Sequence, residues 1–333
     1  MLFDRRTGKR LAAGAVALAA AVSLAACTGP DAATNDSSGT EGSGDVNRSI
    51  VFDYPYTMLP VYPIVLAAAQ EEADAQGYEL LTTEDEASLD KQVANLGTMI
   101  TRGVGAIVSF PIETSALAPT LEQAQTAGTK WITYGGNMDG EDGSLDLANT
   151  ESGELTAKAL GDWLDAQGIT SGTVLVLGND TVELGRQRTD GMIEGLKKYA
   201  PGLTVVQELA LGSDEGSSVT QAKLVADPSI DYVLAVNDDT AIGAANAFQE
   251  AGKDVATSFI AGNDGAPNVL KDIRDGNGYV KATIALNLSE VGRALVQTSI
   301  AAIEGTGSTT WSATPVLATK DAPELDELIA QFD

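Results

Sequence analysis

The stretch Gly105–Tyr134, GAIVSFPIETSALAPTLEQAQTAGTKWITY, decides the fold class of this chain. It begins with a buried-type strand, continues through a polar break into an Ala-rich helix that closes on Ala-Gly, and ends in a second apolar strand. The stretch Tyr232–Gly262, YVLAVNDDTAIGAANAFQEAGKDVATSFIAG, repeats this layout about 127 residues later. Two strand–helix–strand units at that separation predict two similar α/β lobes rather than a short-period repeat protein.

Strand and helix patterns alternate on both sides of these two units. Short apolar runs predict strands at 48–53, 78–82, 105–110, 130–134, 173–177, 203–207, 232–236, 258–261 and 279–285. Longer Ala-rich or periodic runs predict helices at 61–77, 87–103, 115–128, 151–168, 183–199, 218–226, 240–252, 266–275 and 288–305. One apolar stripe of the helix 87–103 is formed by Leu89, Val93, Leu96 and Ile100. The alternation predicts an α/β fold of doubly wound parallel sheets covered by helices on both faces.

The composition excludes several classes of enzyme. The 333 residues include no His and one Cys, so the chain has no Ser-His-Asp or Cys-His triad and no His-containing zinc site. The lone Cys cannot form an internal disulfide or a thiolate cage. With 20 Lys and Arg against 47 Asp and Glu, the net charge is −27, which repels the phosphates of nucleic acid. We therefore expect a protein that binds without reacting, with no cofactor, no metal and no nucleic-acid partner.

The N-terminus has the parts of an export signal. Residues 1–10 are basic, and residues 11–26 are apolar but short for a membrane span. The run ends at Leu24-Ala25-Ala26-Cys27, which resembles the bacterial lipobox, whose Cys is lipidated and becomes the first residue after cleavage. This resemblance implies a signal peptide at 1–26 and a lipid anchor, including palmitate, on Cys27. The alternative is an ordinary signal peptide that ends in Cys by chance.

A polar segment separates this anchor from the folded body. Residues 28–47 are dominated by Gly, Ser, Thr, Asp and Asn, and such a segment cannot bury enough apolar surface to order itself. We expect residues 27–47 to form a flexible tether that starts at the lipidated Cys. Removal of residues 1–26 takes away four cations and one anion, which leaves a net charge of −30 on the exported chain. The predicted location is the outer side of the cytoplasmic membrane, or the periplasm.

The body from Arg48 to about Thr319 resembles the sugar-binding proteins of the ribose-binding class, which have the type I periplasmic binding protein fold. The resemblance rests on the order and spacing of four matches. They are Gln92–Pro111 (QVANLGTMITRGVGAIVSFP), Arg188-Thr-Asp-Gly191, Asn237-Asp238 with Ala241-Ile-Gly243, and Gly262-Asn-Asp-Gly265.

This resemblance implies that the chain crosses between two lobes three times, near 147–150, 284–287 and 314–317. The first lobe would combine residues 48–147 with 287–314, and the second would combine 150–284 with 317–333. Because ligands of open α/β sheets bind beyond the carboxyl ends of the strands, the two lobes would hold the ligand in a cleft between them. The class delivers a captured solute to an ABC permease, so a membrane permease is the implied partner.

In the second lobe the resemblance implies three ligand-binding residues. Arg188 matches the sugar-contacting Arg of the class, and a guanidinium offers several fixed donors to sugar oxygens. Asn237 and Asp264 match a ligand-binding Asn and Asp, and each follows an expected strand. The alternative for Arg188 is a surface ion pair with Glu183 or Asp190. The alternative for the other two is to cap the next helix.

The first lobe departs from the class pattern. Gly135, Gly136 and Asn137 stand where ribose-binding proteins carry an Asp-Arg pair, and Leu286 replaces the pocket Gln of the second crossing. The resemblance therefore does not imply ribose itself as the ligand. Asn137 is the candidate for the missing polar partner, and the two glycines would let backbone amides approach a ligand closely.

Aromatic residues follow the first expected strand. Tyr54 and Tyr56 are candidates for pocket walls, because an aromatic ring covers the apolar face of a sugar and a phenol adds a hydroxyl. The alternative for both is ordinary core packing, which we also expect of Trp131 inside its apolar strand.

Together these patterns predict a monomeric, lipid-anchored binding protein that captures a sugar or polyol and delivers it to an ABC permease. A sensory protein with the same fold, which presents a furanone-like signal or a nucleoside to a receptor, is the alternative. Carboxylates are abundant enough for a glycoside hydrolase, but no pair stands out. Export and the lack of a helix-turn-helix argue against a repressor.

Overall fold

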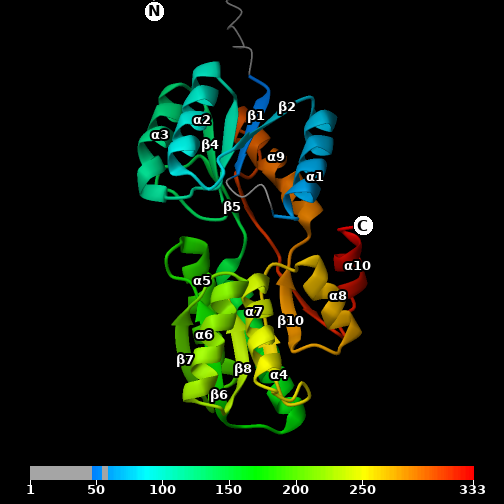
Figure 1. Ribbon diagram of the computed structural model, residues 1–333. Coiled ribbons are helices and arrows are strands. Elements are labelled where there is room, and N and C mark those ends of the chain that lie inside the picture. Colours follow the sequence, from blue (N-terminus) through cyan, green and yellow to red (C-terminus); the bar gives the residue numbers. More distant parts are fainter. Residues whose placement is uncertain (1–46, 55–58) are drawn as a thin grey trace, which may run out of the picture. The chain divides into compact units, whose positions relative to one another are not determined.

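The computed structural model describes residues 47–54 and 59–333, which fold into two α/β lobes, each built on a six-stranded sheet (Figure 1). Some of the predictions fall on residues outside these ranges. They concern the signal peptide at 1–26, the lipidated Cys27, the tether as far as residue 46, and Tyr56.

The first lobe has a fully parallel sheet. Its strands are β1 (Ser49–Tyr54), β2 (Glu79–Glu84), β3 (Ala106–Ser109), β4 (Lys130–Tyr134), β5 (Gly143–Asp146) and β11 (Thr310–Ser312), in the order β11-β5-β4-β3-β1-β2. Helices α1 (Tyr62–Gln76) and α9 (Leu288–Glu304) cover one face, and α2 (Leu89–Arg102) and α3 (Thr114–Thr126) cover the other. Trp131 is fully buried under α2 and α3, which confirms the core position predicted for it.

The second lobe repeats this plan with one antiparallel edge. Its strands are β6 (Gly172–Gly178), β7 (Leu203–Leu209), β8 (Ile230–Ala235), β9 (Phe259–Ala261), β10 (Val280–Ala285) and β12 (Val316–Thr319), in the order β12-β10-β9-β8-β6-β7. The edge strand β12 runs antiparallel to β10, and the other pairs of this sheet are parallel. Helices α4 (Asn149–Gln167) and α5 (Glu183–Tyr199) cover one face. The other face is covered by α6 (Ser213–Ala226), α7 (Asp238–Glu250), α8 (Pro267–Asp275) and α10 (Leu325–Ala330).

The chain passes between the two sheets at three places. β5 leads into α4 through residues 147–148, β10 leads into α9 through 286–287, and β11 leads into β12 through 313–315. The predicted fold class, two doubly wound parallel-sheet lobes joined by three crossings, is confirmed. The first crossing contains Ala148, whose φ of 52° is in the left-handed region that few residues other than glycine adopt.

The predicted apolar stripe of α2 is wrong at one position. Val93 is 38% exposed, whereas Gln92 beside it is fully buried. The side-chain amide of Gln92 donates to Asp53 and to the carbonyl of Phe110, and its oxygen accepts from the backbone N–H of Ile112. Gln92 makes these hydrogen bonds in the protein interior, and it therefore occupies the buried position that the helical period predicted for Val93.

The structure also contains elements that the sequence patterns did not predict. β5, β11, β12 and α10 are short, and their few apolar residues give no clear period. α6 begins at Ser213, five residues before the predicted start. The apolar pattern does not indicate this start, because the first turn holds only polar residues and Gly216. A side chain at Gly216 would place Cβ 2.5 Å from the carbonyl oxygen of Thr240, so glycine permits close packing of α6 on α7. In the described part of the chain, no helix combines the length and the apolar character needed to cross a bilayer.

Candidate ligand-binding site

Arg188 lies in the first half of α5, and its guanidinium is fixed at the carboxyl edge of the second sheet. Nη1 donates to Asp264 Oδ1 at 2.6 Å and to the carbonyl oxygen of Val236 at 3.1 Å. Nε donates to Asn149 Oδ1 at 3.2 Å, and only 11% of the Arg188 side chain is exposed. The fold therefore brings two of the predicted residues, Arg188 and Asp264, into direct contact.

The alternative ion pair predicted for Arg188 is wrong. Glu183 pairs with Arg186, the exposed arginine one half-turn earlier on α5. Within the described residues, the ion partner of Arg188 is Asp264. This pair joins α5 to the loop after β9, whereas a pair with Glu183 or Asp190 would have stayed on one helix.

Asn149 is a residue of this cluster that the sequence reasoning missed. It is the first residue of α4, directly after the first crossing, and it is 2% exposed. Its oxygen accepts from Arg188, and its nitrogen donates to Gln187 Oε1 at 3.4 Å. Asn149 thus positions the arginine rather than facing solvent. The available signal was a polar residue placed directly after a predicted crossing.

Asp264 has a backbone conformation that residues other than glycine avoid. Its φ is 116°, and strained φ values of this kind cost about 1–3 kcal/mol and cluster at functional sites. The surrounding protein displaces water and raises the pKa of the Asp264 carboxyl, an effect that Arg188 opposes. Because 44% of the side chain remains exposed, solvent weakens both influences.

Asn237 follows β8 and caps α7. Its Oδ1 accepts from the backbone N–H of Thr240 at 2.8 Å, so the helix cap that we considered as an alternative role is present. The side chain is half-buried, and its Nδ2 has no hydrogen-bond partner among the described residues. One residue can therefore both cap the helix and offer a donor beside Val236, whose carbonyl holds Arg188.

Asp238 is a buried carboxyl group that fixes the loops at the carboxyl edge of the second sheet. It is 1% exposed, and it accepts from Thr283 Oγ1 and from the backbone N–H of Ala266, each at 2.7 Å. Burial, and secondly the charge of Asp264, raise the pKa of Asp238 well above its ordinary value. The carboxylate ties the loops after β8 and β9 to β10, which explains why these loops hold their positions.

An aromatic cluster occupies the corresponding edge of the first lobe. The ring centroids of Tyr54 and Tyr62 lie 4.6 Å apart, those of Phe52 and Tyr134 lie 5.4 Å apart, and those of Phe110 and Tyr134 lie 5.9 Å apart. Tyr54 is 5% exposed and belongs to the buried core of this lobe, so most of its ring is used in packing.

Tyr134 is a second residue that the sequence reasoning missed. It ends β4 and is 6% exposed. Burial raises the pKa of its phenol, and the positive charge of Arg188 partly opposes this increase. The electrostatic influence of Arg188 therefore reaches an aromatic residue of the first lobe.

The residues after β4 differ from one another in role. Gly135 has a φ of 75°, and a Cβ there would lie 2.9 Å from the Phe110 ring, so only glycine fits. Asn137 is exposed in the loop that follows. Leu286 is half-buried in the second crossing, where its carbonyl accepts from Gln331 Nε2 at 3.4 Å.

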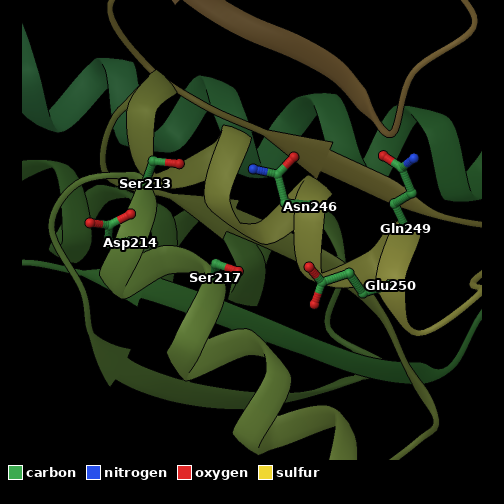
Figure 2. Close-up of a pocket in the computed structure, with 6 residues that line it drawn as sticks. All are labelled: Ser213, Asp214, Ser217, Asn246, Gln249 and Glu250. Atoms are coloured by element: carbon green, nitrogen blue, oxygen red, sulfur yellow. The ribbon is translucent and has the colours of Figure 1, made fainter.

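A separate hollow of about 510 Å³ lies between α6 and α7 (Figure 2). Its lining is polar and contains no residue of the Arg188 cluster. The lining residues are Ser213, Asp214, Ser217, Asn246, Gln249 and Glu250.

A family model described as periplasmic binding protein domain matches residues 51–307. The chain belongs to this family. Periplasmic binding proteins of this family bind substrates and are not enzymes. The predicted membership of the ribose-binding class with the type I fold is confirmed.

Several proteins of known function or structure are similar to this binding protein. It is 26% identical over 247 residues to the ribose import binding protein of Escherichia coli K12, a match that covers 74% of this chain and 81% of the relative. It is 27% identical over 233 residues to the galactofuranose-binding protein of the same organism, covering 66% and 72%. An ABC transporter solute-binding protein from Mycobacterium smegmatis, solved with bound glycerol, is 27% identical with a TM-score of 0.72, covering 84% of this chain and 96% of that one.

Proposed function

We propose that this binding protein captures a sugar or polyol at the Arg188 cluster and delivers it to an ABC permease from a lipid anchor on Cys27. The names of its relatives specify ribose import and galactofuranose binding, and one solved relative holds glycerol. These solutes share several hydroxyl groups on a small uncharged frame. The basic flank, the apolar run and the Cys at 27 support the anchor from the sequence.

The contact between Arg188 and Asp264 is the observation that carries this proposal. Arg188 Nη2 and Asp264 Oδ2 have no hydrogen-bond partner among the described residues, so each group of this ion pair keeps one polar atom for a ligand. A hydroxyl can give its proton to the carboxylate while a neighbouring oxygen accepts from the guanidinium. Asn237 Nδ2 supplies a further donor at the same edge. This combination suits two adjacent hydroxyl groups.

The first lobe would supply the less polar wall. We assign this role to the aromatic cluster that includes Tyr54, Phe110 and Tyr134, because an aromatic ring packs on the C–H face of a sugar. The two tyrosines are nearly buried and support the half-buried ring of Phe110. Asn137 is the polar group that we assign to the ligand from this side, since it is exposed directly after the strand.

Ligand contacts with both lobes would favour a closed arrangement, which is the state that a permease can distinguish from the free protein. Asn149 supports such coupling because it is the first helical residue after a crossing and holds Arg188 Nε.

A thermal-shift screen tests the ligand class. The wild-type protein is heated with a panel of pentoses, hexoses, furanoses and polyols, beside Arg188→Ala and the matched control Arg186→Ala. We expect one group of these solutes to stabilise the wild type and Arg186→Ala but not Arg188→Ala. The ligand class is wrong if no member of the panel stabilises the wild type, and the site is wrong if Arg188→Ala responds like the control.

Cell fractionation tests the anchor separately. The wild-type protein should sediment with membranes and carry acyl chains detectable by mass spectrometry, whereas Cys27→Ala should not. A wild-type protein that is found wholly in the soluble fraction would rule out the anchor and leave the ligand site untouched.

A further inference from the structure

Asp53 is a buried carboxyl group near the carboxyl end of β1, and three side chains donate to it. Thr83 Oγ1 donates to Oδ1 at 2.8 Å, while Gln92 Nε2 and Ser109 Oγ donate to Oδ2 at 2.8 Å and 2.7 Å. Asp53 is 0% exposed. These donors come from β2, α2 and β3, so a single carboxyl group joins the elements that surround the end of β1.

Asp85 is a second fully buried carboxyl group beside Asp53. Thr83 lies opposite Asp53 in the β1–β2 pairing and donates to it, and Asp85 follows Thr83 by two residues, at the end of the same strand. Its Oδ1 accepts from Asn95 Nδ2 at 2.7 Å. Its Oδ2 is buried and receives no hydrogen bond from the described residues. Buried polar atoms are nearly always satisfied, so this oxygen requires an explanation.

Among the residues that the structure describes, no cation compensates the two groups. The charged residues nearest in the chain are turned to solvent, where Lys91 of α2 pairs with Glu86, both at least half exposed. Glu84 at the end of β2 and Asp90 of α2 are exposed and would add negative charge. The side chains from β3 and β2 that contact Asp53 are hydroxyls. Within the same ranges, no group of three or more potential ligands forms a metal site either.

We propose that Asp53 and Asp85 bind one proton between them, in a hydrogen bond that includes Asp85 Oδ2. Burial and mutual repulsion both raise the free energy of two neighbouring ionised carboxylates when no cation is near. A shared proton removes one of the two charges. The same proton gives Asp85 Oδ2 the partner that it otherwise lacks. The pair then carries one negative charge, which the three donors to Asp53 and the amide of Asn95 stabilise. This inference is independent of the proposed sugar binding.

The proton site is connected to the binding edge of the first lobe. Gln92 donates to Asp53 and to the carbonyl of Phe110, and it accepts from the N–H of Ile112 at 3.1 Å. Phe110 in turn packs on Tyr134 in the aromatic cluster. Loss of the proton to water would place a second negative charge beside Asp53 and weaken the network that holds the segment after β3.

The sign of the pH dependence follows from the pKa of Asp53. Burial, and secondly Asp85, raise this pKa well above 3.8. A raised pKa in the folded state means that the folded protein holds the proton more tightly than the unfolded chain. The associated stability is complete below about pH 4 and is lost as the pH rises towards the raised pKa of the folded protein.

Infrared spectroscopy of the full protein at neutral pH tests the proposal directly. Asp238 is a further buried acid with a raised pKa, so the spectrum of each variant is subtracted from that of the wild type. In these difference spectra we expect the C=O band of one protonated carboxylic acid, which shifts in D₂O. Asp53→Asn and Asp85→Asn should each lose this band and remain folded, because an amide N–H replaces the shared O–H as donor to the remaining carboxylate. Glu71→Gln, at an exposed position on α1, is the matched control and should keep the band.

Two results would overturn the proposal. One is a wild-type protein without any such band at neutral pH, and the other is a band intensity that is the same in the wild type and in both Asn variants. Urea unfolding provides the second measurement: wild-type stability relative to Asp85→Asn should fall as the pH rises above about 4. A constant difference, or a wild-type stability that depends on added Na⁺ or K⁺ and no longer does so in Asp85→Asn, would show that the pair holds no proton.

Discussion

Arg188 Nη1 lies 2.6 Å from Asp264 Oδ1, although the two residues are 76 positions apart in the chain. The parallel sheet explains this proximity. In the order β9-β8-β6 the carboxyl ends of neighbouring strands share one edge, so the loop after β9 and the helix after β6 meet above the end of β8. The carbonyl of Val236, at the end of β8, is the third member of the contact. One helix and two loops from distant parts of the sequence thus form one polar cluster.

Replacement of Arg188 by Lys should weaken sugar binding by about tenfold to a hundredfold, equivalent to about 1.5–3 kcal/mol. An ammonium keeps the charge, but it cannot donate in the fixed directions that serve Asn149, Val236 and Asp264 together. Isothermal titration calorimetry measures the change. Arg186→Lys is the control on the exposed side of α5 and should bind like the wild type. Unchanged affinity of Arg188→Lys would mean that the guanidinium geometry is not used.

Asp264→Gly and Asp264→Ala should both lose sugar binding but differ in stability. Both remove the carboxylate, and both leave Arg188 without its ion partner. Only glycine adopts a φ of 116° without strain, so Asp264→Gly should be more stable than Asp264→Ala by about 1 kcal/mol or more. Urea unfolding of the two variants gives this difference directly. Equal stabilities would indicate that the loop relaxes to an ordinary conformation.

Gly191→Ala should destabilise the second lobe by about 1–3 kcal/mol. A Cβ at this position of α5 would lie 2.1 Å from the carbonyl oxygen of Thr150 on α4, so the two helices would have to separate. Arg188 lies on the same helix, and ligand affinity should fall as well. Gly97→Ala on α2 is the matched control, because a Cβ added there would have no described atom within 4 Å. This control should gain up to about 1 kcal/mol of stability from its higher helix propensity, and urea unfolding of both variants measures the two changes.

Gln331→Ala should lower the free energy of unfolding by about 1 kcal/mol, because it removes a hydrogen bond at the second crossing. Gln331 Oε1 accepts from the backbone N–H of Leu288 at 2.8 Å, directly after the crossing residues 286–287. Gln331→Glu keeps an acceptor at this place and should cost less than the alanine variant. If the two variants unfold at the same urea concentration, the hydrogen bond does not contribute to stability.

Much of the fold was predictable because its main determinants are local. Apolar strands such as the one that contains Trp131, and Ala-rich helices that end at glycine, repeat along the body and specify the α/β layers. The elements that were missed, β5, β11, β12 and α10, are short segments that depend on neighbours supplied by distant parts of the chain. Gln92 shows the same limitation within a helix, since three hydrogen bonds to two other segments, β1 and the segment after β3, outweigh the apolar period.

The candidate site was predictable in part. The class motifs identified Arg188, Asn237 and Asp264, but the ion pair between the first and the last depends on strand order, which local patterns do not encode. Asn149 carries only the weak signal of a polar residue after a predicted crossing, and Tyr134 carries none, because a tyrosine in an apolar strand is common in any α/β protein. The relevance of Asn149 arises from its hydrogen bond to Arg188, and that of Tyr134 from its place in the aromatic cluster.

A crystal structure of the protein with the most stabilising sugar or polyol of the screen is the most direct test of the central claim. We predict that adjacent hydroxyl groups of the ligand lie within hydrogen-bonding distance of Arg188 Nη2 and Asp264 Oδ2, with Asn237 Nδ2 as a further donor. A ligand bound elsewhere, for example in the polar hollow between α6 and α7, with Arg188 and Asp264 still paired only to each other, would contradict the account.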